Sequence, residues 1–207
     1  MPDYRTIYNE VFTREESYNL AQYSPGFLNC VAERSTFSVL SGRVLDVGCG
    51  AGFAMEYLAT APLRFESWGV DASDVAVQRA HRRMARFRRA RAEHIQVWSG
   101  PTLPHADNFF SVVICFDMLQ HLDEADIDST LLEISRTLRK GGLFLGSVCC
   151  RPSRLKDTNG DNLHRTVKGI DWWIKRVKPD RVTFDPSHGQ LTFGMRNNKQ
   201  DTQDEQD

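Results

Sequence analysis

Short apolar runs alternate with longer amphipathic stretches from residue 43 onward. A strand that is apolar along nearly its whole length is typical of a parallel sheet covered by helices on both faces. The alternation therefore predicts successive βαβ units. The expected strands are RVLDVG at 43–48, SWGVD at 67–71, HIQVW at 94–98, SVVICF at 111–116 and LFLGSV at 143–148.

The stretches between these runs predict helices at 52–60, 73–91 and 124–139. We expect the third to end at the Lys-Gly-Gly run from 140 to 142, because glycine after a basic last turn is a common helix end. A polar, irregular segment follows at 151–168.

The C-terminal part predicts a short amphipathic helix, GIDWWIKRV, and then an antiparallel hairpin of RVTF and QLTFGM around DPSHG. The fold class is therefore α/β: a three-layer α/β/α sheet of seven strands, mostly parallel, with a C-terminal antiparallel hairpin. We expect one domain over residues 1–200. Residues 1–40, which are rich in tyrosine, are expected to form an N-terminal helical cap, and the acidic tail at 201–207 is expected to be disordered.

Composition narrows the class of protein. Hydrophobic residues make up 41% of the 207 positions and charged residues 26%, near the average of globular proteins. No apolar run approaches the roughly 20 residues of a membrane span, and the N-terminus lacks the pattern of a secretory signal. We therefore expect a cytoplasmic protein without a membrane partner.

The net charge and the cysteines are also consistent with a cytoplasmic protein. The net charge of −1 gives no indication of a nucleic-acid partner. The five cysteines form no CxxC pair and fall mostly in strand-like runs, so we interpret them as reduced thiols and expect no zinc site.

Three glycines follow the first strand in VLDVGCGAGFAMEYL. Gly48, Gly50 and Gly52 stand where the backbone must turn sharply and approach a ligand closely. The spacing is GxGxG, and Phe53 occupies the place where a dinucleotide-binding turn has its third glycine. The second strand ends in Asp71, placed to accept hydrogen bonds from ribose hydroxyls, although it could also cap the next helix.

The segments DVGCGAGF, WGVDAS and LPHADNFFSVVICFDMLQHL, in this order, resemble the Rossmann-like class I S-adenosylmethionine-dependent methyltransferases, in particular the branch with an LPF and LEHL type signature. The resemblance covers roughly residues 43–148 and implies S-adenosyl-L-methionine as the cofactor. It implies that the methionyl part of the cofactor contacts Asp46 and the glycine turn, and that its amino group contacts the backbone near Phe116. It also implies that the ribose contacts Asp71 and that the adenine contacts Ala72. The full set of implied cofactor-binding residues is Asp46, Gly48, Cys49, Gly50, Gly52, Phe53, Asp71, Ala72, Ser99, Gly100 and Phe116.

Two departures from the family pattern bear on function. Many relatives have an acid after the third strand that binds the adenine amino group, and Ser99 stands there instead. The NPPY or DPPY motif with which DNA amino-methyltransferases hold a flipped base is absent, since the fourth strand continues as CFDM. DNA adenine chemistry is therefore disfavoured.

Methyl transfer needs alignment of the two reactants and, for a hydroxyl acceptor, removal of a proton. Three residues near the ends of the fourth and fifth strands are candidates for this catalytic work: His121, His164 and Asp117. His121 could instead pack structurally, as in the LEHL segment of relatives. The segment 149–175, which holds His164 and two tryptophans, is expected to lie on the acceptor side but could be a plain surface loop.

Two further groups of residues carry weaker signals. Asp157, Asp161 and Asn162 could bind a divalent cation, but they sit in one polar run, and we expect no metal. The seven arginines between 79 and 91 are interpreted as the solvated face of a helix, or else as a docking patch for RNA. The apolar face of the same helix includes Val77, Ala80, Met84 and Phe87.

The leading hypothesis is a methyltransferase that acts on a hydroxyl or amine of a small molecule or glycan. The alternatives are a methyltransferase that acts on RNA or protein, and an inactive module that binds the cofactor and regulates a partner. Ser99 favours the inactive module, whereas the intact glycine turn, Asp71 and the two histidines favour an enzyme.

Overall fold

The computed structural model describes residues 3–15, 18, 27–28, 41–59, 65–87 and 92–198. Most of the expected N-terminal cap and the whole acidic tail at 201–207 lie outside these residues. The described part contains a seven-stranded sheet with the order β3-β2-β1-β4-β5-β7-β6. Its strands are β1 (Arg43–Val47), β2 (Glu66–Asp71), β3 (Ile95–Val97), β4 (Phe110–Phe116), β5 (Leu138–Cys149), β6 (Arg181–Asp185) and β7 (Gln190–Arg196).

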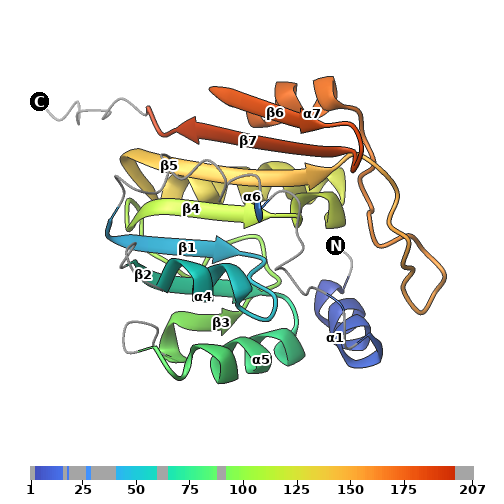
Figure 1. Ribbon diagram of the computed structural model, residues 1–207, viewed down its shortest axis with the longest axis horizontal. Coiled ribbons are helices and arrows are strands. Elements are labelled where there is room, and N and C mark those ends of the chain that lie inside the picture. The colour runs from blue at the N-terminus through green and yellow to red at the C-terminus, as the bar shows by residue number, and fades with distance from the viewer. Residues whose placement is uncertain are drawn as a thin grey trace, which may run out of the picture.

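The sheet is mixed in the way the sequence predicts. Strands β1 to β5 pair in parallel, and β7 runs antiparallel to both β5 and β6 (Figure 1). The fold class, a mostly parallel Rossmann-like sheet with a C-terminal antiparallel hairpin, is therefore confirmed.

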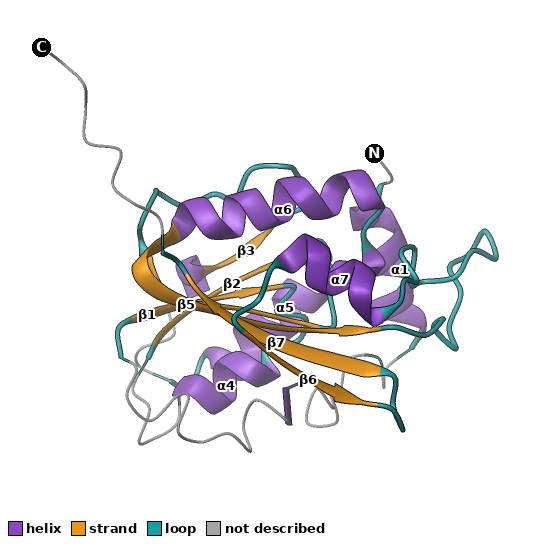
Figure 2. Ribbon diagram, turned by 90° about the horizontal axis from the view of Figure 1, so that it is seen from above, coloured by secondary structure: helices purple, strands orange, loops and turns teal. Residues whose placement is uncertain are grey.

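Helices cover both faces of this sheet. They are α1 (Tyr4–Arg14), α4 (Phe53–Ala59), α5 (Asp74–Met84), α6 (Glu124–Thr137) and α7 (Ile170–Val177), joined by the 3₁₀ turns η2 (Ala92–His94) and η3 (Leu119–His121). Figure 2 shows α6 and α7 above the sheet and α4 below it, where α5 packs against α4 through Met55 and Ala80. The largest core cluster lies under α6 and α7 and contains the fully buried Trp173.

One predicted boundary is wrong in an informative way. Helix α6 ends at Thr137, and the Lys-Gly-Gly run belongs to β5, which already begins at Leu138. Leu138 pairs with Phe110 of β4 and is 2% exposed. The side-chain amide of Asn197 donates a hydrogen bond of 2.7 Å to the carbonyl of Leu138. Burial and a distant partner thus end the helix before the glycines do.

Two other expected elements are shorter than predicted. Helix α5 ends at Met84, residues 85–87 form a turn, and 88–91 lie outside the described residues. Strand β3 spans only Ile95–Val97, because His94 belongs to η2 and stacks on Trp68 with the ring centroids 3.7 Å apart. Ring packing against β2 therefore decides where β3 begins.

Candidate functional site

A cavity of about 590 Å³ opens where β1, β2 and β4 end. The chain leaves β1 toward β2 on one side and later returns to β4 on the other, so the cavity lies at the topological switch point of the sheet, the usual place for a ligand in such folds. Figure 1 shows α1 and the loop after β5 beyond the same ends of the strands.

The glycine turn forms the floor of the cavity at the end of β1. The amides of Gly48 and Cys49 donate to the carbonyl of Val70, at 2.8 and 3.0 Å, which ties the turn to β2. Gly48 and Gly52 both have φ of +79°, which favours glycine. Gly52 faces away from the cavity, since an added Cβ atom there would lie 3.1 Å from the Cβ of Ala80 in α5. Its role is close packing of the turn against a helix.

The cavity gathers most of the residues that the family resemblance implied for the cofactor. Phe53 lies at the start of α4 under the guanidinium of Arg83, which stands 3.5 Å from its ring centroid. Phe53, Gly50 and Gly52 do not line the cavity and instead support the turn. The implied residues that line it are Asp46, Gly48, Cys49, Asp71, Ala72, Ser99, Gly100 and Phe116.

Two buried carboxyl groups face the cavity. Asp71 accepts hydrogen bonds from the amides of Gly50 and Ser73, at 2.8 and 2.9 Å. Burial raises the pKa of Asp71, although these two amides act against the rise. Burial, with a smaller contribution from the charge of Asp71, raises the pKa of Asp46 to about 8. A cationic ligand would stabilise both groups in their charged forms.

The two candidate histidines both line the cavity and lie next to each other, with ring centroids 4.9 Å apart. The Nδ1 atom of His164 is 2.6 Å from the carbonyl oxygen of Arg151, and that of His121 is 2.9 Å from the carbonyl oxygen of Leu163. A carbonyl only accepts, so in both rings Nδ1 carries the proton and Nε2 is the basic nitrogen.

Their environments distinguish the two rings as bases. Burial lowers the pKa of both, and it lowers that of His121 to about 3, with a further contribution from His164. For His164 the charge of Asp117 acts in the opposite direction and favours the protonated form. A general base has to keep the proton that it takes from the acceptor. Because the pKa of His121 is lowered to about 3, His164 suits that role better.

Asp117 lies directly after β4 in a left-handed conformation, with φ of +55°. Its backbone amide donates to the carbonyl of Ser147, and its Oδ1 atom accepts hydrogen bonds from Ser147 Oγ and Gln190 Nε2. Such backbone strain in a non-glycine residue costs about 1–3 kcal/mol and gathers at functional sites. The neighbouring strands β5 and β7 thus hold the Asp117 carboxylate at the cavity.

Helix α1 closes one side of the cavity. Its Tyr4 hydroxyl donates to Asp126 Oδ2 at 2.7 Å and accepts from the amide of Asp123 at 2.9 Å, which joins α1 to the start of α6. Arg5 forms a two-armed ion pair with Asp74 at the start of α5, with both contacts at 2.7 Å. The start of α1 is therefore anchored to the starts of both α6 and α5.

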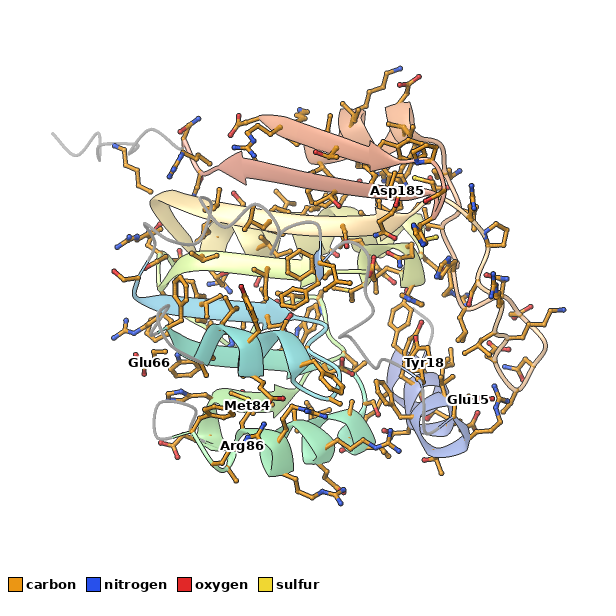
Figure 3. The ribbon with its side chains drawn as sticks, in the orientation of Figure 1. Glu15, Tyr18, Glu66, Met84, Arg86 and Asp185 are labelled. Carbon is orange, nitrogen blue, oxygen red and sulfur yellow. The ribbon has the colours of Figure 1, made fainter. Side chains whose placement is uncertain are left out.

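The sequence did not reveal several residues of the cavity wall. Tyr8 of α1 places its ring edge-on to His121, with centroids 5.6 Å apart. Tyr18 lies beside α1 (Figure 3), and Trp98 and Gln120 complete this part of the wall. The run of tyrosines indicated a cap, but only the tertiary structure shows which rings face a ligand.

The segment after β5 is fastened to the start of α6. Thr166 Oγ1 donates to the carbonyl of Leu122 at 2.7 Å, and Arg165 pairs with Asp123 at 2.7 Å. Trp173 in α7 is fully buried in the core and does not line the cavity. The residues of the segment after β5 that line the cavity are Ser153 and His164.

The residues considered for a metal serve the loop itself. Asp157 Oδ1 accepts from the amides of Asn159 and Asp161, each at 2.9 Å, and Asn162 Oδ1 accepts from the amide of His164 at 2.9 Å. Within the described part of the chain, no group of three His, Cys, Asp or Glu side chains is arranged to hold a metal ion.

The described arginines of α5 and the turn after it have partners within the protein. Arg79 donates to the carbonyl of Phe12 at 2.8 Å, Arg83 pairs with Glu56 at 2.7 Å, and Arg86 also contacts Glu56. These contacts join α5 to α1 and α4. They favour the interpretation of this face as structural and solvated over a docking patch for RNA.

Residues 44–142 match the model of a family described as a methyltransferase domain. The chain carries a class I S-adenosylmethionine-dependent methyltransferase domain. The matched residues run from β1 into β5 and so include the glycine turn, Asp71, Asp117 and His121. The segment that bears His164 lies outside the matched region of the methyltransferase domain.

Curated relatives are similar to part of this chain. A protein of Mycolicibacterium smegmatis, named "Probable S-adenosylmethionine-dependent methyltransferase", is 34% identical over 122 residues, which cover 58% of this chain and 42% of the relative. A ubiquinone biosynthesis O-methyltransferase of Pseudomonas putida is 26% identical over 141 residues, which cover 67% of this chain and 58% of the relative. The chain thus spans about half the length of these relatives.

Among solved structures, the fold is similar to a chain in the complex of the Haloferax volcanii Trm112 methyltransferase activator with a methyltransferase. The TM-score is 0.70 at 15% identity, over 97% of this chain and 100% of that one. At this identity the likeness concerns the fold alone. In the described part of the methyltransferase, no helix is long and apolar enough to cross a membrane.

Proposed function

We propose that this protein transfers a methyl group from S-adenosylmethionine to a hydroxyl or amine of a small molecule or glycan in the cytoplasm. The observation that carries the proposal is a single cavity at the switch point that brings together the glycine turn, Asp71, Asp117 and His164. Cofactor residues and candidate proton-accepting residues thus line the same cavity, as methyl transfer requires.

The residues present fit the implied cofactor. Asp71 ends β2 with a buried carboxylate that still has lone pairs for a ribose diol, and Ala72 beside it leaves space for a flat base. Asp46 and Asp71 favour a cationic ligand. When bound, S-adenosylmethionine supplies an electrophilic methyl group, and the chain's own part is to align the acceptor and to take its proton on His164.

The other hypotheses are less well supported. Among the described arginines of the α5 region, Arg79, Arg83 and Arg86 make contacts within the protein, which argues against a docking patch for RNA. An inactive regulatory module would not need His164 in the cavity wall with its Nδ1 atom held by the carbonyl of Arg151 and its Nε2 atom left basic. The similarity to an O-methyltransferase of ubiquinone biosynthesis supports a small-molecule acceptor.

Calorimetric titration with S-adenosylmethionine, S-adenosylhomocysteine and NAD tests the proposal. We expect micromolar binding of both sulfur ligands and none of NAD. Failure to bind either sulfur ligand would overturn the cofactor assignment. Binding without methyl transfer to any acceptor in a broad screen of alcohols, phenols and amines would instead favour the regulatory module.

A further inference from the structure

Four carboxyl side chains belong to the cavity wall. They are Asp46 in β1, Asp71 at the end of β2, Asp117 directly after β4 and Asp126 in α6. Among the described residues that line the cavity there is no lysine or arginine. A site that binds phosphate or carboxylate groups normally offers cationic side chains. This wall therefore favours neutral or cationic groups.

Gln120 is a further polar residue of the same wall. The residue is 1% exposed and lies in η3 between the end of β4 and α6. Its backbone carbonyl accepts a hydrogen bond from the amide of Thr166 at 3.0 Å. Its side-chain Oε1 is buried without a hydrogen-bond partner among the described residues. Buried polar atoms are nearly always paired, so this acceptor is suited to a ligand that donates.

The neighbouring polar groups have the same preference. The Asp117 carboxylate only accepts hydrogen bonds when ionised, and the Nε2 atom of His164 is the unprotonated nitrogen of its ring. A hydroxyl or ammonium group could donate to any of these three side chains. A carboxylate or phosphate would meet acceptors and like charges and would lose its hydration without compensation.

We propose that Gln120 accepts a hydrogen bond from the methyl acceptor, and that the acceptor is a neutral or cationic molecule that carries a hydroxyl or amine in addition to the reacting group. This inference rests on the proposed function, because it assigns the cavity to cofactor and acceptor together. Gln120 is thus a specificity residue, and the described part of the wall disfavours anionic acceptors.

Four phenols with different side arms test the preference for charge and donors. Tyramine carries an ammonium, tyrosol a hydroxyl, para-ethylphenol no polar group and para-hydroxyphenylacetate a carboxylate. Their binding to the protein loaded with S-adenosylhomocysteine is measured by calorimetry or ligand-observed NMR. We expect tyramine and tyrosol to bind more tightly than para-ethylphenol, and para-hydroxyphenylacetate to bind most weakly.

The variant Gln120→Met keeps the length of the side chain and removes the acceptor. We expect it to bind tyrosol about tenfold more weakly, the effect of one hydrogen bond. Its affinity for S-adenosylhomocysteine should stay within about twofold of the wild type. Its Tm without ligand should equal or exceed that of the wild type, because an unpaired buried oxygen is removed.

Thr192→Val is the matched control. The Thr192 hydroxyl is also buried without a hydrogen-bond partner among the described residues, but Thr192 lies in β7 and does not line the cavity. This variant should also keep or raise Tm and should leave tyrosol binding unchanged. It separates the effect of a lost buried oxygen from the loss of a ligand contact.

Three results would overturn the inference: equal binding of tyrosol and para-hydroxyphenylacetate, unchanged tyrosol binding by Gln120→Met, or an equal loss of S-adenosylhomocysteine affinity in that variant. Absence of binding by all four phenols to the loaded protein would also overturn it and would leave the cofactor assignment intact. A wild-type protein that does not bind S-adenosylhomocysteine would contradict the proposed function itself.

Discussion

Met118 occupies the space that a side chain at Gly48 would need. A Cβ atom added to Gly48 would lie 2.5 Å from Met118 Cγ, and Gly48 has φ of +79°. The turn after β1 and the segment after β4 therefore fit together only with glycine at this position. Both segments belong to the cavity wall, so a change at this contact should affect the cofactor as well as stability.

We expect Gly48→Ala to lower the free energy of unfolding by more than the roughly 1–2 kcal/mol of a left-handed backbone alone. It should also weaken S-adenosylmethionine binding. Gly160→Ala is the control, because Gly160 has φ of +86° and an added Cβ would meet nothing within 4 Å. Denaturant unfolding and calorimetry measure both effects. Equal losses of stability in the two variants would show that the Met118 contact is unimportant.

Replacement of His164 by alanine should lower kcat about 10²–10⁴-fold if His164 is the general base. Cofactor affinity should not change, because Asp71 and the glycine turn are untouched. Release of S-adenosylhomocysteine with the first acceptor found by screening gives the rate. His188→Ala is the control, since His188 is exposed at the β6–β7 turn and does not line the cavity. Full turnover by the His164 variant would leave the residue a structural part of its loop.

The pH profile offers a second readout of His164. Burial lowers its pKa below the ordinary 6.5, so the basic form persists in mildly acidic solution. We expect kcat to decline only as the pH falls through this lowered pKa. A decline centred above pH 6.5 would point to a different base.

Asp71→Ala should weaken S-adenosylmethionine binding by about 1–3 kcal/mol through loss of charge-assisted hydrogen bonds. It should also lower Tm, because the amides of Gly50 and Ser73 lose their partner. Asp128→Ala removes an acid that pairs with Arg176 outside the cavity and should leave calorimetric affinity unchanged. Wild-type affinity in the Asp71 variant would show that the ribose lies elsewhere.

The stability of the ligand-free protein should depend on Asp46. Its folded-state pKa is raised from 3.8 to about 8, so between these values the folded state keeps a proton that the unfolded state has lost. Stability from this group is therefore complete at low pH and declines as the pH rises toward about 8.

Asp46→Asn cannot ionise and should remove this decline. We expect its Tm to exceed that of the wild type by a margin that grows across the same pH window. Asp107→Asn, at an exposed acid paired with Arg136, is the control. Parallel wild-type and Asp46→Asn profiles of Tm against pH would contradict the prediction.

The sequence by itself determined the elements and their order. Apolar runs such as SVVICF must be buried on both faces, and this requirement alone predicts a parallel sheet between helices. The glycine turn and Asp71 were also visible, because their chemistry depends on local backbone conformation and on the position at the end of a strand. The predicted end of α6 at the Lys-Gly-Gly run was wrong, because the contacts of Leu138 with β4 and Asn197 end the helix earlier.

Only the tertiary structure decided which residues share the cavity. His164 follows β5 by sequence, yet it meets His121 because the loop folds back onto η3, and Tyr8 joins them from α1. The sequence did not single out Gln120, because its significance depends on burial without a partner among the described residues. The pairings of His121 with His164 and Tyr8 join residues about 40 and more than a hundred positions apart in the chain. No local pattern encodes them, because they arise from packing of the whole chain.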